Sequence, residues 1–268
     1  IMDIHTGEFL TDVIFSEKFR TKAIEYANLK MDVYFGPYYD IQQLVEAGFT
    51  GYKYYAQYGD AILPATINVR GDYSEFYIEG GQRYEAVDYT IECDWSSAAA
   101  IMVAAAIAGE VTISNISTLS RQADTAICRA LERAGASIII EQDSITVAHR
   151  KLEAFTFDAT QCPDLFPALA ALAAAAEGES VIYGTHRLEH KESNRAEAIK
   201  QEYAKLGIEV RLEGDAMYIK GGEIHSAECD SHHDHRIAMS AAVSALRSDG
   251  EILIHDAECV AKSYPDFF

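Results

Sequence analysis

The sequence predicts an α/β fold turned inside out, in which alanine-rich helices lie in the core and sheets surround them. Three segments are so rich in alanine, with so little polar surface, that a helix formed by any of them must be covered on most sides. Each is followed by a glycine and a short β-branched strand, and this unit recurs about every 70 residues. We therefore expect an inverse (inside-out) α/β repeat domain with buried parallel helices and outer sheets, plus a partial second lobe.

The three alanine-rich helices are expected to begin at similar places in the three repeats, near Trp95, Pro163 and His235. The glycines expected to end them in left-handed caps are Gly109, Gly178 and Gly250. Parallel helices in a core point several positive N-terminal ends at one face of the domain. Such a face suits anions.

The first two repeats continue in the same way. Residues 123–147 and 194–219 both predict an amphipathic helix, a glycine, a strand, a turn and a second strand. The glycines and turn residues at matching places are Gly135, Gly207, Asp143 and Asp215. Chance similarity among alanine-rich helices is the alternative, and these matching positions argue against it. The third repeat stops before its second helix is complete.

The composition is typical of a globular protein and limits its partners. Of the 268 residues, 49% are apolar and 24% charged, and the formal net charge of −20 argues against a nucleic-acid partner. The longest apolar run, residues 98–108, is shorter than the roughly 20 residues that cross a membrane, and no secretory signal opens the chain. The five cysteines form no C-x-x-C pair, so we expect reduced thiols in a cytoplasmic protein without a membrane partner.

Unusual polar residues collect where the predicted helices begin. Asp164 lies at the start of the second alanine-rich helix. An acid is common at this place in any helix, so Asp164 could also be a simple helix cap. Lys191 and Arg195 lie four residues apart at the next helix start, where they would share a helix face and repel each other. An anion between them, or an acid such as Glu192, would relieve this repulsion. A solvated charged face is the alternative.

The segment D-S-H-H-D-H-R, residues 230–236, first suggests a metal site. Its histidines follow one another in a turn, where side chains diverge, and no second ligand pair supports them. We therefore prefer a helix start without a metal, in which Asp234 caps the helix and Arg236 directs its guanidinium into the anion-binding face. Lys262, in A-K-S-Y-P-D-F-F, joins this set of cations unless it is an ordinary surface lysine.

These motifs resemble a known family in their order and spacing. C-P-D, H-K-E-S-N-R, H-D-H-R-I-A-M and A-K-S-Y-P-D-F-F look like the C-terminal portion of EPSP synthase, 3-phosphoshikimate 1-carboxyvinyltransferase. E-C-D-W-S-S-A-A, residues 92–99, resembles the start of that domain, and the resemblance covers roughly residues 76–268. It implies two domains of inverse α/β repeats.

The resemblance also implies a reaction. The enolpyruvyl group of phosphoenolpyruvate is transferred to the 5-hydroxyl of shikimate 3-phosphate, and phosphate is released, on the pathway to chorismate and the aromatic amino acids. Addition is followed by elimination, and no metal or organic cofactor is used. Asp164 would be the base near the 5-hydroxyl, Lys191 would contact shikimate 3-phosphate and the reacting oxygen, and Glu192 would handle the proton at the methylene.

Further residues would bind the substrates according to the same resemblance. Arg195, Arg236 and Lys262 would hold the phosphate and carboxylate of phosphoenolpyruvate, because fixed cations neutralise a polyanion. His235 would be a supporting neighbour of Arg236. The stretch G-P-Y-Y-D resembles the family's P-Y-x-D helix start and makes Tyr38 a candidate substrate contact.

The rest of the chain departs from the family pattern. Residues 1–85 are expected to be a remnant of the N-terminal lobe, and residues 86–268 the C-terminal lobe of about three repeats. The N-terminal lysine-serine, N-G-T and serine-serine-glutamine motifs are missing, and Asn194 stands where the family usually has aspartate. A single lobe keeps half a cleft, so we expect the activity, and a monomer, for the intact protein and little turnover by this chain alone.

Three alternatives stay open. The related enolpyruvyl transferase acting on UDP-N-acetylglucosamine is the nearest, although H-K-E-S-N-R favours the shikimate branch. A non-catalytic lobe left by truncation is the second. A metal-dependent hydrolase built on S-H-H-D-H is the third.

Overall fold

The computed structural model describes residues 34–35, 53–54, 67–69, 76–78 and 91–268. The short strands before residue 91 form two pairs: β1 (Tyr34–Phe35) lies parallel to β2 (Lys53–Tyr54), and β3 (Ile67–Val69) lies antiparallel to β4 (Phe76–Ile78). The chain divides into compact units at Thr90 and Ile91. The sequence predicts a boundary five residues earlier, and the origin of the first unit as a remnant lobe stays a prediction.

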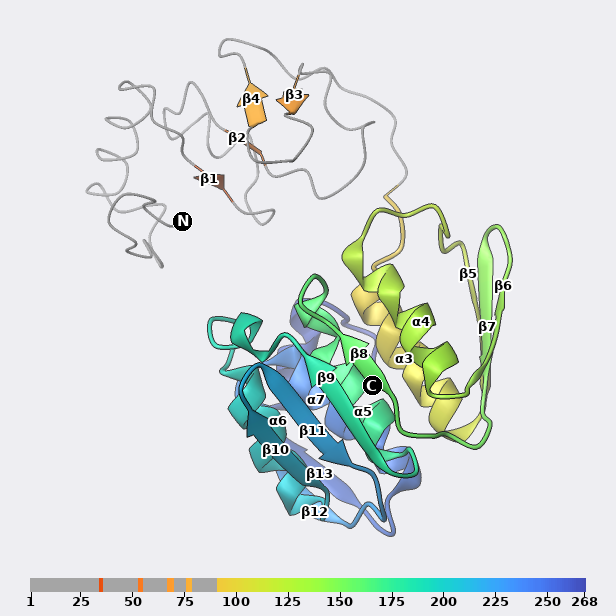
Figure 1. Cartoon of the computed structure of the whole chain (residues 1–268), viewed down its shortest axis with the longest axis vertical. Helices are drawn as coiled ribbons and strands as arrows, with labels where there is room; N and C mark the ends of the chain where they lie inside the picture. The colour runs from red at the N-terminus through yellow and green to blue at the C-terminus, as the bar shows by residue number, and fades with distance from the viewer. Residues whose placement is uncertain (1–33, 36–52, 55–66, 70–75, 79–90) are drawn as a thin grey trace, which may run out of the picture. The chain divides into compact units, whose positions relative to one another are not determined.

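Alanine-rich helices form the core of residues 91–268. They are α3 (Trp95–Ala108), α5 (Phe166–Ala174) and α7 (His235–Ser244). The three contact one another. In α5 all residues but Ala168 are buried, so this helix has no solvent-exposed face. Figure 1 shows the strands β5 to β11 outside these helices. The predicted inside-out arrangement is confirmed.

Two larger sheets cover the core. The first is antiparallel and has the order β5 (Glu110–Ser114), β7 (Ser144–Ala148), β6 (Ser137–Ile140). The second has the order β10 (Glu209–Glu213), β11 (Ala216–Lys220), β9 (Glu179–Tyr183), β8 (Thr156–Asp158). On β7 the alternate residues Ile145 and Val147 are buried while their neighbours are half-buried, as expected for a strand with one face on the core.

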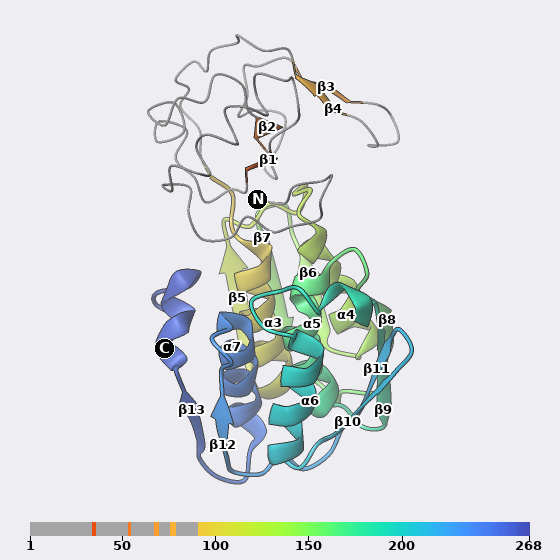
Figure 2. The same cartoon turned by 90° about the vertical axis from the view of Figure 1, so that its left-hand side faces the viewer.

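The predicted repeat is present. The amphipathic helices α4 (Ile127–Arg133) and α6 (Arg195–Lys205) each lead through a left-handed glycine into a hairpin, β6–β7 and β10–β11. In the third repeat, β12 (Ala227–Asp230) lies parallel to β13 (Ile252–His255), and a 3-10 helix, Ala257–Lys262, follows. Figure 2 shows α7 beside β12 and β13.

Two local predictions were wrong. Gly178 has the expected left-handed φ of 103°, but Gly109 is extended at −170° and Gly250 has no positive φ. At Gly250 the absence of a Cβ matters for packing instead, since an added Cβ would lie 3.0 Å from the Ser226 Cβ. Strands β8 and β12, which precede α5 and α7, were not predicted, because three or four residues are too few to show alternation.

Two further observations concern the expected environment of the chain. None of the helices in the described ranges is long and apolar enough to cross a membrane. All five cysteines have free thiols, and Cys128, Cys162 and Cys229 are buried.

Candidate active site

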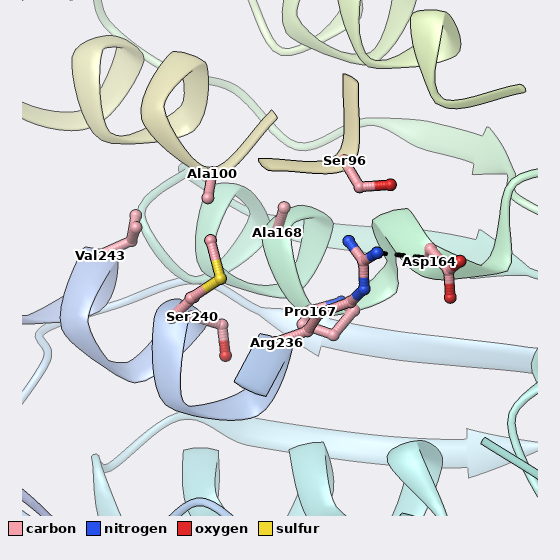
Figure 3. A pocket seen from close by; sticks show the side chains of 9 residues that line it. Ser96, Ala100, Asp164, Pro167, Ala168, Arg236, Ser240 and Val243 are labelled. Carbon is pink, nitrogen blue, oxygen red and sulfur yellow. Dashed lines mark ion pairs between the residues drawn. The ribbon is translucent and has the colours of Figure 1, made fainter. Parts of the chain in front are cut away.

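The N-terminal ends of α3, α5 and α7 converge on one pocket. It is lined by side chains from these three helices and the turn before α5: Ser96, Ala100, Asp164, Pro167, Ala168, Arg236, Met239, Ser240 and Val243. Figure 3 shows Arg236 beside Asp164, with Ser96 on the α3 side. The predicted convergence of helix starts, each with positive partial charge, is present at this pocket, and anion binding there stays a prediction.

Arg236 is directed into the pocket by the start of α7. The carboxylate of Asp234 caps this helix and accepts a hydrogen bond from the Arg236 backbone N–H at 3.0 Å. Nη2 of Arg236 lies 4.0 Å from Oδ2 of Asp164, and its buried Nε has no hydrogen-bond partner among the described residues. The predicted cap is confirmed, and Arg236 lines the pocket as predicted.

Asp164 is surrounded by cations and does not cap its helix. Its Oδ1 accepts from Nη1 of Arg195 at 2.6 Å and lies 3.1 Å from Nζ of Lys191. Burial alone would raise the pKa of Asp164, but the three cations, led by Arg236, hold it well below its usual range. The carboxylate is therefore ionised and aligned at the pocket wall.

Lys191 and Arg195 do not share a helix face, contrary to the sequence analysis. Helix α6 begins only at Arg195, so Lys191 lies in the turn before it. Both cations instead meet at the same oxygen of Asp164. An acid does lie between them, but it is Asp164, from the start of the alanine-rich helix of the same repeat.

Arg195 is the buried centre of the charged cluster. Its side chain has no exposed surface, and each guanidinium nitrogen faces a carboxylate. Nε donates to Asp234 at 2.7 Å, Nη1 to Asp164 at 2.6 Å, and Nη2 to Glu192 at 2.6 Å. Ser193 also donates to Asp234, at 3.1 Å. Arg195 thus fixes three acids at once.

Glu192 connects this cluster to the end of the chain. Besides Arg195, it pairs with Lys262, whose Nζ lies 3.3 Å from Oε1 of Glu192. Burial acts to raise the pKa of Glu192, but the charge of Arg195, a backbone hydrogen bond and the charge of Lys262 together outweigh it, so the pKa is lowered. Lys262 is half exposed and ends its 3-10 helix, so it lies at the edge of the site.

The histidines of residues 230–236 point in different directions. Nε2 of His232 lies 2.8 Å from Glu202, and Nδ1 of His233 lies 2.5 Å from Asp256. His235 is buried in the first turn of α7, where burial and then the charge of Arg236 lower its pKa. No group of three or more His, Cys, Asp and Glu side chains in the described part of the chain could hold a metal ion.

Comparison with known proteins identifies the family. Residues 62–268 match the family model described as EPSP synthase (3-phosphoshikimate 1-carboxyvinyltransferase). The chain belongs to the EPSP synthase family. The family match begins earlier than the residue 76 expected from the motifs.

Members of the EPSP synthase family are similar in sequence and structure to this chain. A 3-phosphoshikimate 1-carboxyvinyltransferase of Clostridium perfringens is 39% identical over 199 residues, which are 74% of this chain and 47% of the relative. One from Methanosarcina acetivorans is 42% identical over 200 residues, covering 73% of this chain and 46% of the relative. An EPSP synthase structure from Acinetobacter baumannii has a TM-score of 0.69 and 28% identity, covering 88% of this chain and 61% of its own. The chain spans about half the length of the curated relatives it matches.

The departure from the family pattern at Asn194 has a local explanation. Asn194 caps α6, and its side chain accepts from the Glu197 backbone N–H at 3.4 Å. Asparagine and aspartate cap helices about equally well, so this substitution preserves the helix start. Tyr38, the candidate from the first unit, lies outside the described residues.

The structure brings seven of the eight sequence candidates into one region and adds residues that the sequence analysis missed. Asp234 was identified as a cap, but its pairing with Arg195, 39 residues away, has no signature in the local sequence. Ser96 and Asp124 were missed altogether, although the first lies in E-C-D-W-S-S-A-A. The substrate contacts of the candidates stay predictions.

Proposed function

We propose that this chain supplies one half of an EPSP synthase active site, in which phosphoenolpyruvate and shikimate 3-phosphate react. The observation that supports this most directly is the contact of Asp164 with Lys191 and Arg195 at the meeting point of three helix starts. The names of the relatives, at about 40% identity, point to the same transfer.

In this proposal the two acids next to Arg195 move the protons. Asp164 takes the proton of the 5-hydroxyl as its oxygen attacks the enolpyruvyl carbon, with Lys191 beside that oxygen. Glu192 gives a proton to the methylene carbon in the addition, for which it must first be protonated, and takes one back in the elimination. There the carbon–oxygen bond to phosphate breaks and the leaving phosphate takes the proton held by Asp164. A bound anion that pairs with the cations around Asp164 weakens their effect on this carboxylate. The pKa of Asp164 then rises, and Asp164 becomes a stronger base.

The charge of the cluster supports the half-site proposal. Four cations lie among four carboxylates; they are Lys191, Arg195, Arg236 and Lys262, among Asp124, Asp164, Glu192 and Asp234. The cluster therefore offers no excess positive charge for phosphorylated substrates. Further cations are needed from the remaining part of a complete protein. For that complete protein we propose a monomer in the cytoplasm, where free thiols stay reduced.

A reconstitution assay tests the proposal. This chain is mixed with the part of the Clostridium perfringens relative that lies outside the match, and phosphate release from phosphoenolpyruvate is measured with and without shikimate 3-phosphate. We expect turnover by the mixture that depends on shikimate 3-phosphate, and little by either part alone. Asp164→Asn in the mixture should lower kcat on the order of 100-fold, the size of a lost proton-transfer group.

The controls separate the alternatives. Arg211→Lys, on the edge strand β10, should leave turnover unchanged. A mixture that associates by size-exclusion chromatography but releases no phosphate would overturn the activity, and transfer to UDP-N-acetylglucosamine would replace it with the related reaction. Robust turnover by the chain alone would overturn the half-site proposal and keep the activity.

A further inference from the structure

Asp124 is a buried acid next to the pocket that the proposed mechanism does not use. It lies on a 3-10 helix, Ala123–Ala126, with 7% of its surface exposed. The hydroxyl of Ser96, in the first turn of α3, donates a hydrogen bond to its Oδ2. A buried carboxylate is costly unless its oxygens accept hydrogen bonds, so the bond from Ser96 is what compensates for burying Asp124.

The residues around Asp124 hold the start of α3. The side chain of Gln122 donates to the Cys93 carbonyl at 2.8 Å and accepts from the Trp95 backbone N–H at 3.0 Å. Together with the bond from Ser96 to Asp124, this segment binds three of four consecutive residues of the chain. They lie directly after Ile91, where the chain enters the second unit.

Asp124 also lies next to the charged groups of the site. Ser96 lines the pocket with Asp164 and Arg236 (Figure 3). The charges that act on Asp124 are those of Asp164, Arg236 and Asp94. Burial raises the pKa of Asp124, and the hydrogen bond from Ser96 is the main effect in the opposite direction. This hydrogen bond is therefore what compensates most for burying the carboxylate.

We propose that Asp124 is a positioning residue: through Ser96 it holds the first turn of α3 as the pocket wall that faces Arg236. The inference rests on the proposed function of this pocket and adds a residue to it. The wall carries the Ser96 side chain and the positive end of α3, and a small displacement of this helix start weakens its contribution to anion binding and catalysis.

Paired variants of the 268-residue chain test the proposal. Asp124→Ala and Ser96→Ala remove the hydrogen bond, whereas Asp124→Asn keeps an acceptor oxygen and removes only the charge. Trp95 is the single tryptophan of the chain and is 2% exposed, so its fluorescence reports on this helix start. We expect red-shifted emission and stronger acrylamide quenching in the two alanine variants, and wild-type values in Asp124→Asn.

Binding of inorganic phosphate, measured by calorimetry, connects the helix start to the pocket. We expect about fivefold weaker binding for the two alanine variants, the order of effect of losing one hydrogen bond, and about twofold or less change for Asp124→Asn. Asp249→Asn, which breaks a surface contact elsewhere, controls for general destabilisation and should leave both readouts unchanged.

Each result decides the inference. Wild-type fluorescence and phosphate affinity in Ser96→Ala would overturn it, and so would an Asp124→Asn variant as impaired as Asp124→Ala, because charge rather than the hydrogen bond would then matter. If the wild-type chain binds no phosphate, the proposed function fails, and the Trp95 readout alone decides whether Asp124 holds α3.

Discussion

Arg195 and Asp234 form an ion pair in which neither side chain has any exposed surface, with Nε of Arg195 2.7 Å from Oδ2 of Asp234. Arg195 begins α6 and Asp234 caps α7, so the pair joins the second repeat to the third beside the pocket. A buried pair of this kind adds little net stability, but removing one partner leaves the other charge buried and alone.

Arg195→Met should therefore destabilise the protein strongly, by about 3–5 kcal/mol in urea unfolding followed by circular dichroism. Arg211→Met removes an arginine whose side chain is 40% exposed, and should cost about 1 kcal/mol or less. The double variant Arg195→Met with Asp234→Asn should recover part of the loss. Equal effects of the two single variants would contradict the buried character of the Arg195 cluster.

A surface histidine should make stability depend on pH. Nδ1 of His225 lies 2.7 Å from Oδ2 of Asp249, and this hydrogen bond raises the pKa of His225. A raised pKa in the folded state means that the stabilisation is complete below the unfolded value of about 6.5 and is lost as pH rises through the folded value. The unfolding free-energy difference between wild type and His225→Gln should thus shrink from pH 6 to pH 9.

The reciprocal variant checks the origin of that pH dependence. Asp249→Asn should abolish the same pH dependence, and the double variant should add nothing further. A difference that stays constant across this range would show that the contact does not depend on the charge of His225.

Substitution by alanine should strongly reduce stability at one glycine and barely change it at another. A Cβ at Gly221 would lie 1.8 Å from the carbonyl oxygen of Ala176, which is backbone and cannot move aside easily. Gly221→Ala should cost about 3 kcal/mol by overpacking. Gly109 has an extended φ of −170° and no neighbouring atom within 4 Å of an added Cβ, so Gly109→Ala should change stability by about 0.5 kcal/mol or less. Thermal unfolding of both variants compares them directly.

The buried thiols should resist alkylation. Burial raises the pKa of Cys162 to about 12 and the pKa values of Cys128 and Cys229 to about 11. With iodoacetamide at pH 8, mass spectrometry should find these three unmodified in the native protein, while the half-buried Cys93 and Cys259 react. All five should react in urea. Native labelling of Cys162 at the rate of Cys93 would contradict its burial.

Features encoded in neighbouring residues were predictable from the sequence. The alanine-rich helices, the hairpins after Gly135 and Gly207, and the capping of α7 by Asp234 all depend on patterns a few residues long. The positive helix starts followed from the repeat, since equivalent helices in a core begin at the same face.

Contacts between residues far apart in the sequence were not predictable in this way. The sequence placed Lys191 and Arg195 on one helix because it could not show that the turn delays the start of α6 until Arg195. It also gave no sign that Asp164 would lie between them, or that Asp124 would bind Ser96, 28 residues away. Such pairs depend on how closely packed helices bring distant side chains together, which local periodicity does not encode.

The walls of the pocket come from three helices, each from a different repeat, that are about 70 residues apart along the chain. An insertion in the loop before one helix therefore moves one wall and leaves the other two on their own sheets. Protein engineers could adjust the width of this pocket one side at a time, with the other two sides as a fixed reference. The same separation would let natural variation reshape the pocket stepwise while the core is preserved.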